Sequence, residues 1–259
     1  MLRLAPRMDS VKAIAAPHIA VCLATIAVAA SVHAADDTIT PLDVARMKSV
    51  SSQAISPDGK SIAYTLRVQR DPLKGENGSA WTELHVVDTG TGKSRPFITG
   101  KVSINGVTWT PDGSGISFLT KRDDDKNTSI YVIPLDGGEA RKLIEHPTSI
   151  SAYDWKGDGK QIAFLAQEKD DPAEKKLRDK GFNAEGYEEN LKSTRIWIAE
   201  AVFDSDTDAR MLDVAGSASE VNWSPDGTLI AAAFAPTPLI DHYYMYRRIR
   251  VLNVETAEI

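Results

Sequence analysis

Ser56-Pro57-Asp58-Gly59 is the stretch that decides the fold, because close copies of it recur along the chain. Pro presets φ for the first central position of a β-turn, Asp suits the second, and Gly takes the positive φ that follows. The other copies are Thr110-Pro111-Asp112-Gly113, Lys156-Gly157-Asp158-Gly159 and Ser224-Pro225-Asp226-Gly227. Their spacings of 54, 46 and 68 residues indicate a structural repeat.

The residues on both sides of each turn repeat as well. An apolar residue stands just before the turn, and an isoleucine followed by a small residue comes after it. The residues before the turns are Ile55, Trp109, Trp155 and Trp223, and the isoleucines are Ile62, Ile116, Ile162 and Ile230. Apolar side chains two positions apart lie on one face of an extended chain, so each turn is predicted to join two antiparallel strands.

Further strands follow each hairpin. In the first repeat they are residues 84–88 and 94–98, joined by a Thr-Gly-Thr-Gly turn, whereas the fourth repeat has only residues 249–253 before the chain stops. Four antiparallel strands per repeat of roughly 40–55 residues are typical of β-propeller blades, and a β-sandwich does not demand such self-similarity. We therefore predict an all-β protein, a partial β-propeller of about four blades. The predicted blades cover residues 50–98, 104–144, 150–214 and 219–259.

The third predicted blade is long because it contains an insertion, residues 167–193. Asp171 is a good N-cap, Pro172 suits the first helical position and Gly181 a helix end, so we predict a short helix here. A second short helix is predicted to begin at Thr40 and to run through Met47.

The fourth predicted blade ends at Ile259, where its outermost strand should begin. Propellers remove exposed sheet edges by closing the ring. We therefore expect this chain to be part of a longer protein, and we expect the isolated chain to associate through its exposed edges. The alternative is a four-bladed ring in which a strand near Ile39 completes the last blade.

Composition and charge exclude several classes of protein. The 259 residues include 36 acidic and 30 basic side chains, a formal charge of −6, which gives no electrostatic footprint for nucleic acid or for anionic membranes. The single cysteine, Cys22, forms neither an internal disulfide nor a cysteine-based zinc site.

Residues 1–34 are typical of a secretory signal peptide. Arg3, Arg7 and Lys12 form a basic start, residues 19–30 are mostly apolar, and small residues precede a predicted cut between Ala34 and Ala35. The alternative, a transmembrane anchor, is disfavoured because the apolar run is short for a bilayer. We expect a periplasmic or secreted protein with no membrane association after cleavage.

Two segments near the start of the repeats carry a resemblance to a known family. Residues 39–47 (ITPLDVARM) and 54–64 (AISPDGKSIAY) resemble the opening of the propeller in secreted bacterial members of the prolyl oligopeptidase family. These are serine peptidases of the dipeptidyl-peptidase and acylaminoacyl-peptidase type. The similarity extends through Tyr187-Glu188-Glu189-Asn190, residues 195–198 and residues 235–239, and so covers residues 38–259.

The resemblance implies a seven- or eight-bladed propeller followed by an α/β-hydrolase domain, with about four of seven blades in this chain. In that family the propeller caps the catalytic domain, admits short peptides and excludes folded proteins. The partners implied are therefore peptide substrates and the hydrolase domain that acts on them. The chain has no Gly-x-Ser-x-Gly sequence, so no catalytic residue is carried over and we predict it to be inactive alone. No cofactor or metal ligand is predicted, and substrate-binding residues are unknown.

Several local patterns resemble functional motifs. Residues 89–94 end like a phosphate-binding loop, but a strand follows, so a hairpin turn is favoured. Asp123-Asp124-Asp125 lacks the spacing of a calcium loop and is interpreted as a solvated connection. His85, His146 and His242 are interpreted as structural residues, with His242 in a loop.

Glu188 and Glu189 form the one pair that we keep as a hypothesis. In some aminopeptidase members of the family, paired glutamates on a propeller insertion bind the free α-amino group of the substrate. The pair here lies in a blade insertion, although its position relative to the strands matches those members poorly. A solvated, charged loop is the favoured interpretation.

Two functions remain open at this point. The first is the non-catalytic, gating propeller of an exported serine peptidase. The second is a periplasmic propeller of the TolB type that acts in protein–protein contacts. TolB-type proteins have another domain before the propeller, whereas only about twenty residues separate Ala35 from the first blade here. A WD-repeat scaffold is disfavoured because no repeat ends its third strand with Trp-Asp.

Overall fold

The computed structural model describes residues 38–184, 186–204 and 208–258. The predicted signal peptide and its cleavage site lie outside the described residues. The chain divides into two compact units, Met1–Val44 and Ala45–Ile259. The short helix α2 (Pro41–Ala45) begins after Thr40, whose backbone N–H donates to Asp43 Oδ2 at 2.9 Å. The prediction that this helix reaches Met47 was wrong, because the helix ends at Ala45, Arg46 lies in a turn, and strand β1 begins at Ser49.

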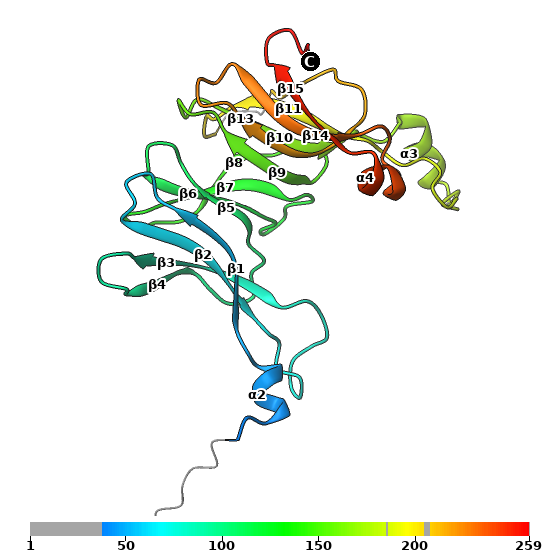
Figure 1. Cartoon of the computed structure of the whole chain (residues 1–259). Helices are drawn as coiled ribbons and strands as arrows, with labels where there is room; N and C mark the ends of the chain where they lie inside the picture. The colour runs from blue at the N-terminus through cyan, green and yellow to red at the C-terminus, as the bar shows by residue number, and fades with distance from the viewer. Residues whose placement is uncertain (1–37, 185, 205–207, 259) are drawn as a thin grey trace, which may run out of the picture. The chain divides into compact units, whose positions relative to one another are not determined.

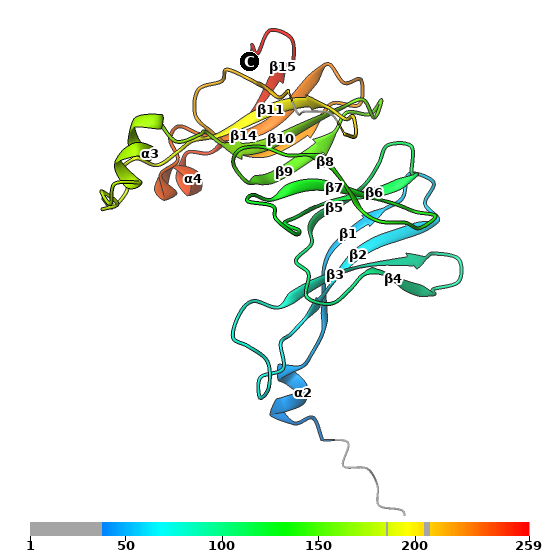
Figure 2. The same cartoon turned by 180° about the vertical axis from the view of Figure 1, so that it is seen from behind.

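Strands dominate the second unit and form four antiparallel sheets, which we call blades 1 to 4 (Figure 1, Figure 2). Each strand pairs with its neighbour in sequence. Blade 1 contains β1 (Ser49–Ile55), β2 (Ser61–Val68), β3 (Trp81–Asp88) and β4 (Ser94–Ile98). Blade 2 contains β5 (Asn105–Trp109), β6 (Gly115–Thr120), β7 (Ser129–Pro134) and β8 (Arg141–Ile144).

Blade 3 contains β9 (Ile150–Trp155), β10 (Gln161–Gln167), β11 (Thr194–Glu200) and β12 (Arg210–Met211). Blade 4 contains three strands, β13 (Ser217–Trp223), β14 (Leu229–Ala235) and β15 (Arg248–Asn253). The predicted partial β-propeller is confirmed. No helix in the described part of the chain is long and apolar enough to cross a membrane.

The repeated turns owe their shape to one aspartate and one glycine each. In the first turn Asp58 Oδ1 accepts hydrogen bonds from Ser56 Oγ at 2.7 Å and from the backbone N–H of Lys60 at 3.0 Å. Gly59 has φ of +72°, a left-handed conformation that favours glycine. The equivalent glycines have nearly the same angle, +72°, +73° and +70° at Gly113, Gly159 and Gly227.

The core lies between successive blades, and every blade therefore has two contact faces. The leading face, which packs on the preceding blade, includes Ile116, Ile162 and Ile230, all with exposed fractions of 0%. The trailing face, which packs on the next blade, includes the third-strand residues Val86 and Val132 and their counterparts. The three clusters between blades 1 and 2, 2 and 3, and 3 and 4 all follow this rule.

The tryptophans before the turns join each blade to the previous one. Trp109 Nε1 donates to the carbonyl of Ala54 at 2.9 Å, and Trp155 Nε1 donates to Ser117 Oγ at 2.8 Å. Trp223 Nε1 is buried and has no hydrogen-bond partner among the described residues. The repeat explains this difference, because Ala163 occupies the place in blade 3 that Ser117 occupies in blade 2.

We expect Ala163→Ser to stabilise the chain by about 0.5–1.5 kcal/mol, because the new hydroxyl would accept a hydrogen bond from the Trp223 indole. Urea unfolding followed by fluorescence would measure the change in the free energy of unfolding. The matched background is Trp223→Phe, which lacks the donor. An equal gain in that background would contradict the assignment of Trp223 as the donor.

Outer strands carry a second repeated contact, which the sequence analysis missed. Arg95 Nη2 donates to the carbonyl of Leu135 in blade 2 at 2.9 Å. Arg141 pairs with Asp204 in blade 3, and Arg210 Nη2 donates to the carbonyl of Val254 in blade 4 at 2.9 Å. These arginines lie opposite equivalent third-strand residues, Val86, Val132 and Ile198. Each outer strand is thus tied to the connection after the third strand of the next blade.

Two short helices interrupt the blades at the connections between their second and third strands. Helix α3 (Pro172–Arg178) lies in the insertion of blade 3, and Asp171 Oδ1 caps it by accepting from the Ala173 N–H at 2.7 Å, as predicted. Helix α4 (Ile240–Met245) lies in blade 4. The interpretation of His242 as a loop residue was therefore wrong. The sequence gives little indication that a helix begins here, because the N-cap residue of α4, Leu239, makes no side-chain hydrogen bond.

Candidate functional site

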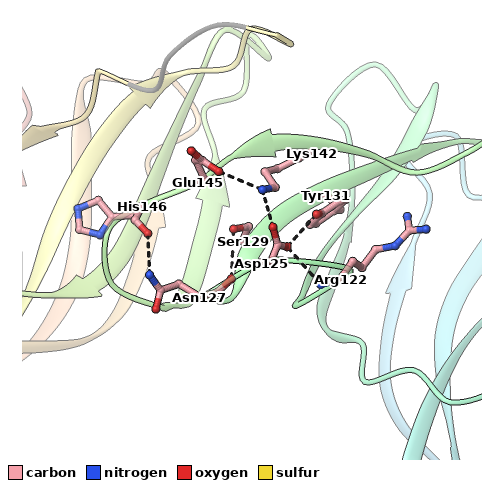
Figure 3. Close-up of polar contacts among 8 residues, drawn as sticks. All are labelled: Arg122, Asp125, Asn127, Ser129, Tyr131, Lys142, Glu145 and His146. Carbon is pink, nitrogen blue, oxygen red and sulfur yellow. Dashed lines mark hydrogen bonds and ion pairs between the residues drawn. The ribbon is translucent and has the colours of Figure 1, made fainter.

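A polar cluster in blade 2 joins charged side chains around one buried carboxylate. Asp125, from the β6–β7 connection, is its centre, and its side chain is only 7% exposed. Tyr131 Oη donates to Asp125 Oδ2 at 2.8 Å, and Lys142 Nζ lies 2.5 Å from Asp125 Oδ1. Figure 3 shows the carboxylate between these two partners, with Glu145 on the far side of Lys142.

Contacts within this cluster set the protonation states of Asp125, Tyr131 and Lys142. Burial alone would raise the pKa of Asp125, but hydrogen bonds from Lys142, Tyr131 and the Arg122 N–H outweigh it, and its pKa is lowered. Burial and the hydrogen bond to Asp125 raise the pKa of Tyr131 to about 12. The carboxylates of Asp125 and Glu145 raise the pKa of Lys142. Lys142 therefore stays protonated and is no nucleophile. The cluster stabilises the β6–β7 connection against strands β7 and β8.

The interpretation of residues 123–125 as a wholly solvated connection was wrong at its last residue. Asp123 and Asp124 are exposed, but Asp125 is buried in the cluster. A run of three aspartates gives no hint of this, because the side chains that contact Asp125, Tyr131 and Lys142, come from strands β7 and β8. Among the described residues, no group of three or more His, Cys, Asp or Glu side chains is arranged to hold a metal ion.

A hollow of about 490 Å³ opens beside the cluster and includes Asn127, Glu145 and His146 in its lining. The His146 ring is buried, with its centroid 4.5 Å from that of Trp197, and its Nδ1 is hydrogen-bonded to Thr148 Oγ1 at 3.0 Å. Thr148 Oγ1 in turn donates to the carbonyl of Gln167 at 2.7 Å. The hydroxyl proton of Thr148 is thus used in a hydrogen bond to the backbone, so His146 and Thr148 act as a structural pair.

We expect His146 to make the chain less stable in mild acid. Burial lowers the pKa of His146, so the ring is neutral in the folded chain, whereas the unfolded chain takes up a proton near the ordinary pKa of about 6.5. Stability is therefore complete above that pH and is lost as the pH falls toward the lower, folded pKa, by up to about 1.4 kcal/mol per pH unit. Denaturant unfolding at several pH values would test this. If the free energy of unfolding of the parent and of His146→Gln changed with pH in the same way, His146 would not be the group responsible.

The other two histidines are also held by local contacts. His85 Nε2 lies 3.2 Å from Glu83 Oε2, and its ring stacks on Tyr64 at 5.5 Å between centroids. His242 Nδ1 is hydrogen-bonded to Thr237 Oγ1 at 2.7 Å, within the turn that leads into α4. The structure thus places the three histidines in separate positions and assembles no catalytic group from them.

Glu188 and Glu189 lie on the insertion of blade 3, and both are exposed. A hollow of about 450 Å³ between α3 and the segment after it includes Glu189 in its lining but not Glu188. Cations next to this hollow already have partners, since Lys192 Nζ lies 2.7 Å from Glu174 Oε2 and Arg178 pairs with Asp170. The structure therefore does not bring the two glutamates together in one hollow, and the amine-binding hypothesis stays a prediction.

The comparison with protein families bears directly on these blades. Residues 44–171 match the prolyl oligopeptidase N-terminal β-propeller domain. Residues 44–171 belong to the prolyl oligopeptidase propeller family. The matched segment contains blades 1 and 2 and continues through β10 of blade 3.

The chain is also similar to one curated protein in sequence and to solved structures in fold. A Bacillus subtilis (strain 168) protein described as the uncharacterized peptidase YuxL is 29% identical over 87 residues, which are 34% of this chain and 13% of that protein. A Pyrococcus horikoshii acylaminoacyl peptidase shares the fold with a TM-score of 0.55 and 14% identity over 81% of this chain and 32% of the peptidase. A TolB structure from Agrobacterium tumefaciens has a TM-score of 0.54 and 16% identity over 81% of this chain and 63% of TolB.

These similarities differ in what they establish. The two structural likenesses, at 14% and 16% identity, concern the propeller fold alone. The chain spans about a third of the acylaminoacyl peptidase and about an eighth of the curated relative.

Proposed function

We propose that this chain is the non-catalytic propeller of an exported serine peptidase that hydrolyses short peptides, and that it controls which substrates reach a hydrolase domain. The match of residues 44–171 to the prolyl oligopeptidase propeller domain carries the proposal. The catalytic serine, aspartate and histidine would lie in the hydrolase domain. The proposed work of the propeller is non-covalent: it would limit substrate size and position peptides.

Active-site labelling and substrate size test this proposal together. The protein encoded by the complete gene would be treated with a fluorophosphonate probe, with the 259-residue chain as the matched control. We expect the complete gene product to be labelled and the control to remain unlabelled. We also expect kcat/KM to fall steeply from short peptides to unfolded proteins and to vanish for folded proteins. Absence of a labelled serine would overturn the proposal.

Export is tested by the mass of the protein recovered from the periplasm or the medium. Cleavage between Ala34 and Ala35 would remove 34 residues, including Cys22, so residues 35–259 of the exported protein would contain no cysteine. Recovery of the uncut chain in the cytoplasm would contradict this part of the proposal.

The paired glutamates allow a test of substrate positioning. We expect Glu188→Gln combined with Glu189→Gln to leave kcat/KM of the complete peptidase on unblocked dipeptides within about twofold, because both side chains are exposed and do not share a hollow. The matched substrate is the same dipeptide with a blocked amino group. A large loss confined to unblocked dipeptides would instead establish amine binding by this pair.

The second candidate is a propeller that binds other proteins, as the sequence analysis left open. The fold shared with TolB is compatible with it. The labelling experiment separates the two candidates, because a propeller that only binds proteins would yield no reactive serine at any length of the gene product.

A further inference from the structure

Two of the seven asparagines stand directly before a glycine, at Asn77-Gly78 and at Asn105-Gly106. Asparagine is one of the thermolabile residues, and a glycine after it removes the side chain that would hinder attack by the next backbone nitrogen. That nitrogen can bond to the asparagine side-chain carbonyl carbon and displace ammonia, which closes a succinimide ring. In a folded protein this step requires that the backbone at both residues can rotate.

The first asparagine-glycine pair lies in the connection between β2 and β3, residues 69–80, outside any strand or helix. Asn77 and Gly78 are both exposed. Among the residues that the structure describes, neither the Asn77 side-chain amide nor the Gly78 N–H has a hydrogen-bond partner. Attack of the Gly78 nitrogen on Asn77 Cγ therefore breaks no hydrogen bond of either group.

The second pair has the same two residues in a restrained place. Asn105 begins strand β5 and pairs with Leu119 of β6, and the Gly106 carbonyl accepts a hydrogen bond from Tyr153 Oη at 2.8 Å. A Cβ built on Gly106 would lie 3.2 Å from Leu119 Cδ1, so the Leu119 side chain packs directly on this glycine. Rotation of the peptide group between Asn105 and Gly106 would break these contacts, and the fold therefore protects this pair.

Arg70 lies against the first pair. Its Nε donates to the carbonyl of Ser79 at 2.8 Å, and its Nη1 donates to the carbonyls of Glu76 and Asn77 at 3.3 and 3.2 Å. A Cβ built on Gly78 would lie 2.6 Å from Arg70 Cζ, so the connection closes tightly around the guanidinium. The positive charge favours loss of the Gly78 amide proton, because an opposite charge nearby stabilises the anion that attacks.

We propose that Asn77 is a site of deamidation through a succinimide formed with Gly78, and that the isoaspartate product releases the connection from Arg70. In the first step the Gly78 nitrogen bonds to Asn77 Cγ, its proton passes to water, and the Cγ–Nδ2 bond breaks as ammonia leaves. Water then adds to either carbonyl of the ring and opens it, which gives aspartate or isoaspartate. One amide is hydrolysed in total, and nothing is oxidised or reduced.

The two products differ in their backbone. Aspartate keeps the normal main chain, whereas the main chain of isoaspartate runs through Cβ and Cγ and is longer by one carbon atom. The carbonyls of Glu76, Asn77 and Ser79 surround one guanidinium, so a longer chain between them no longer matches its donors. The Arg70 guanidinium also lies 4.2 Å from the centroid of the Trp81 ring, and this stacking fixes its position.

This inference goes beyond the proposed function and does not depend on it. Its tests follow covalent structure and backbone exposure and need no peptidase activity. A failure of the labelling experiment would therefore leave it unaffected, and its own failure would leave the labelling experiment unaffected.

Peptide mapping by mass spectrometry tests the reaction. The purified protein, with its folding verified by circular dichroism, would be incubated in warm, mildly alkaline buffer and digested in acid at intervals. We expect Asn77 to be converted about tenfold faster than Asn105, with isoaspartate among the products. Equal rates at the two sites would overturn the proposal. Aspartate without any isoaspartate would also overturn it, because direct hydrolysis of the amide gives aspartate alone.

The same incubation in concentrated urea is the control for the flanking sequence. Unfolding frees Asn105 from its strand, so we expect the two sites to be converted at similar rates. If the difference seen in the folded protein persisted in urea, the neighbouring residues and not the fold would select Asn77, and the proposal would be overturned.

Limited proteolysis tests the release of the connection. Lys74 is exposed within it and is a site for trypsin. The deamidated fraction, separated by anion exchange, would be compared with Asn77→Asp, which has the same charge and a normal backbone. We expect trypsin to cut the isoaspartate form at Lys74 about tenfold faster than this variant, because opening of the connection exposes its backbone. Equal cutting of the two would overturn the proposed release from Arg70.

Discussion

Phe164→Ala is expected to lower the free energy of unfolding by about 3–5 kcal/mol, the usual cost of removing a buried phenylalanine side chain. Phe164 is fully buried in the cluster between blades 2 and 3, and its ring meets that of His146 edge-on at 5.6 Å. The substitution leaves a cavity in the layer that joins the two middle blades. Since small domains are stable by only about 5–15 kcal/mol, this loss would remove a large share of the free energy of unfolding.

Phe182→Ala is the matched control for that prediction. It removes the same atoms from a residue that is 71% exposed on the insertion of blade 3, and it is expected to change stability by less than about 0.5 kcal/mol. Urea unfolding followed by tryptophan fluorescence would compare the two. Similar losses in both variants would show that the contact between blades 2 and 3 does not limit stability.

Asp125→Ala is expected to cost about 3 kcal/mol, at the lower end of the range for breaking a buried ion pair. It leaves the Tyr131 hydroxyl and the Lys142 ammonium without the carboxylate that they share. The Lys142 side chain is 34% exposed, so water offsets part of the loss. Asp124→Ala, one residue earlier and exposed, is the control and is expected to be nearly neutral.

The same variant has a pH signature. The folded pKa of Asp125 is lower than its unfolded value of about 3.9, so its contribution is complete above that pH and is lost as the pH falls through the folded pKa. Asp125→Ala should therefore flatten the acid side of the stability curve. If Asp125→Ala lost stability with falling pH as the parent does, and was equally stable at neutral pH, Asp125 would not be the charged centre of the cluster.

The fold was predictable because its signal is local and repeated. A turn such as residues 56–59 needs only its own aspartate and glycine, and the alternation of apolar residues beside it fixes which side faces a neighbouring blade. The N-cap of α3 was predictable for the same reason, since Asp171 and Pro172 lie next to the helix that they start. In α4, by contrast, no capping side chain marks the start, and the helix was missed.

The interactions that were missed all join residues distant in sequence. Arg95 donates to a carbonyl forty positions later, which is meaningful only once two blades lie side by side. From the sequence alone Asp125 is expected to be solvated, because its partner Lys142 lies on strand β8 and is close only in the folded chain. The failure of Trp223 Nε1 to find a partner likewise depends on one alanine in the previous blade. No propensity or periodicity reports such pairings.

Contacts between strands of different blades join blade 1 to 2, 2 to 3 and 3 to 4. Each blade therefore depends on its immediate neighbours, as in linear repeat proteins, where cooperativity spreads along one dimension. Local opening should begin at the two ends of the series and travel inward. Amide hydrogen exchange is expected to be fastest in β1 and β15 and slowest in β6 and β10. The end blades would then open before the two middle blades.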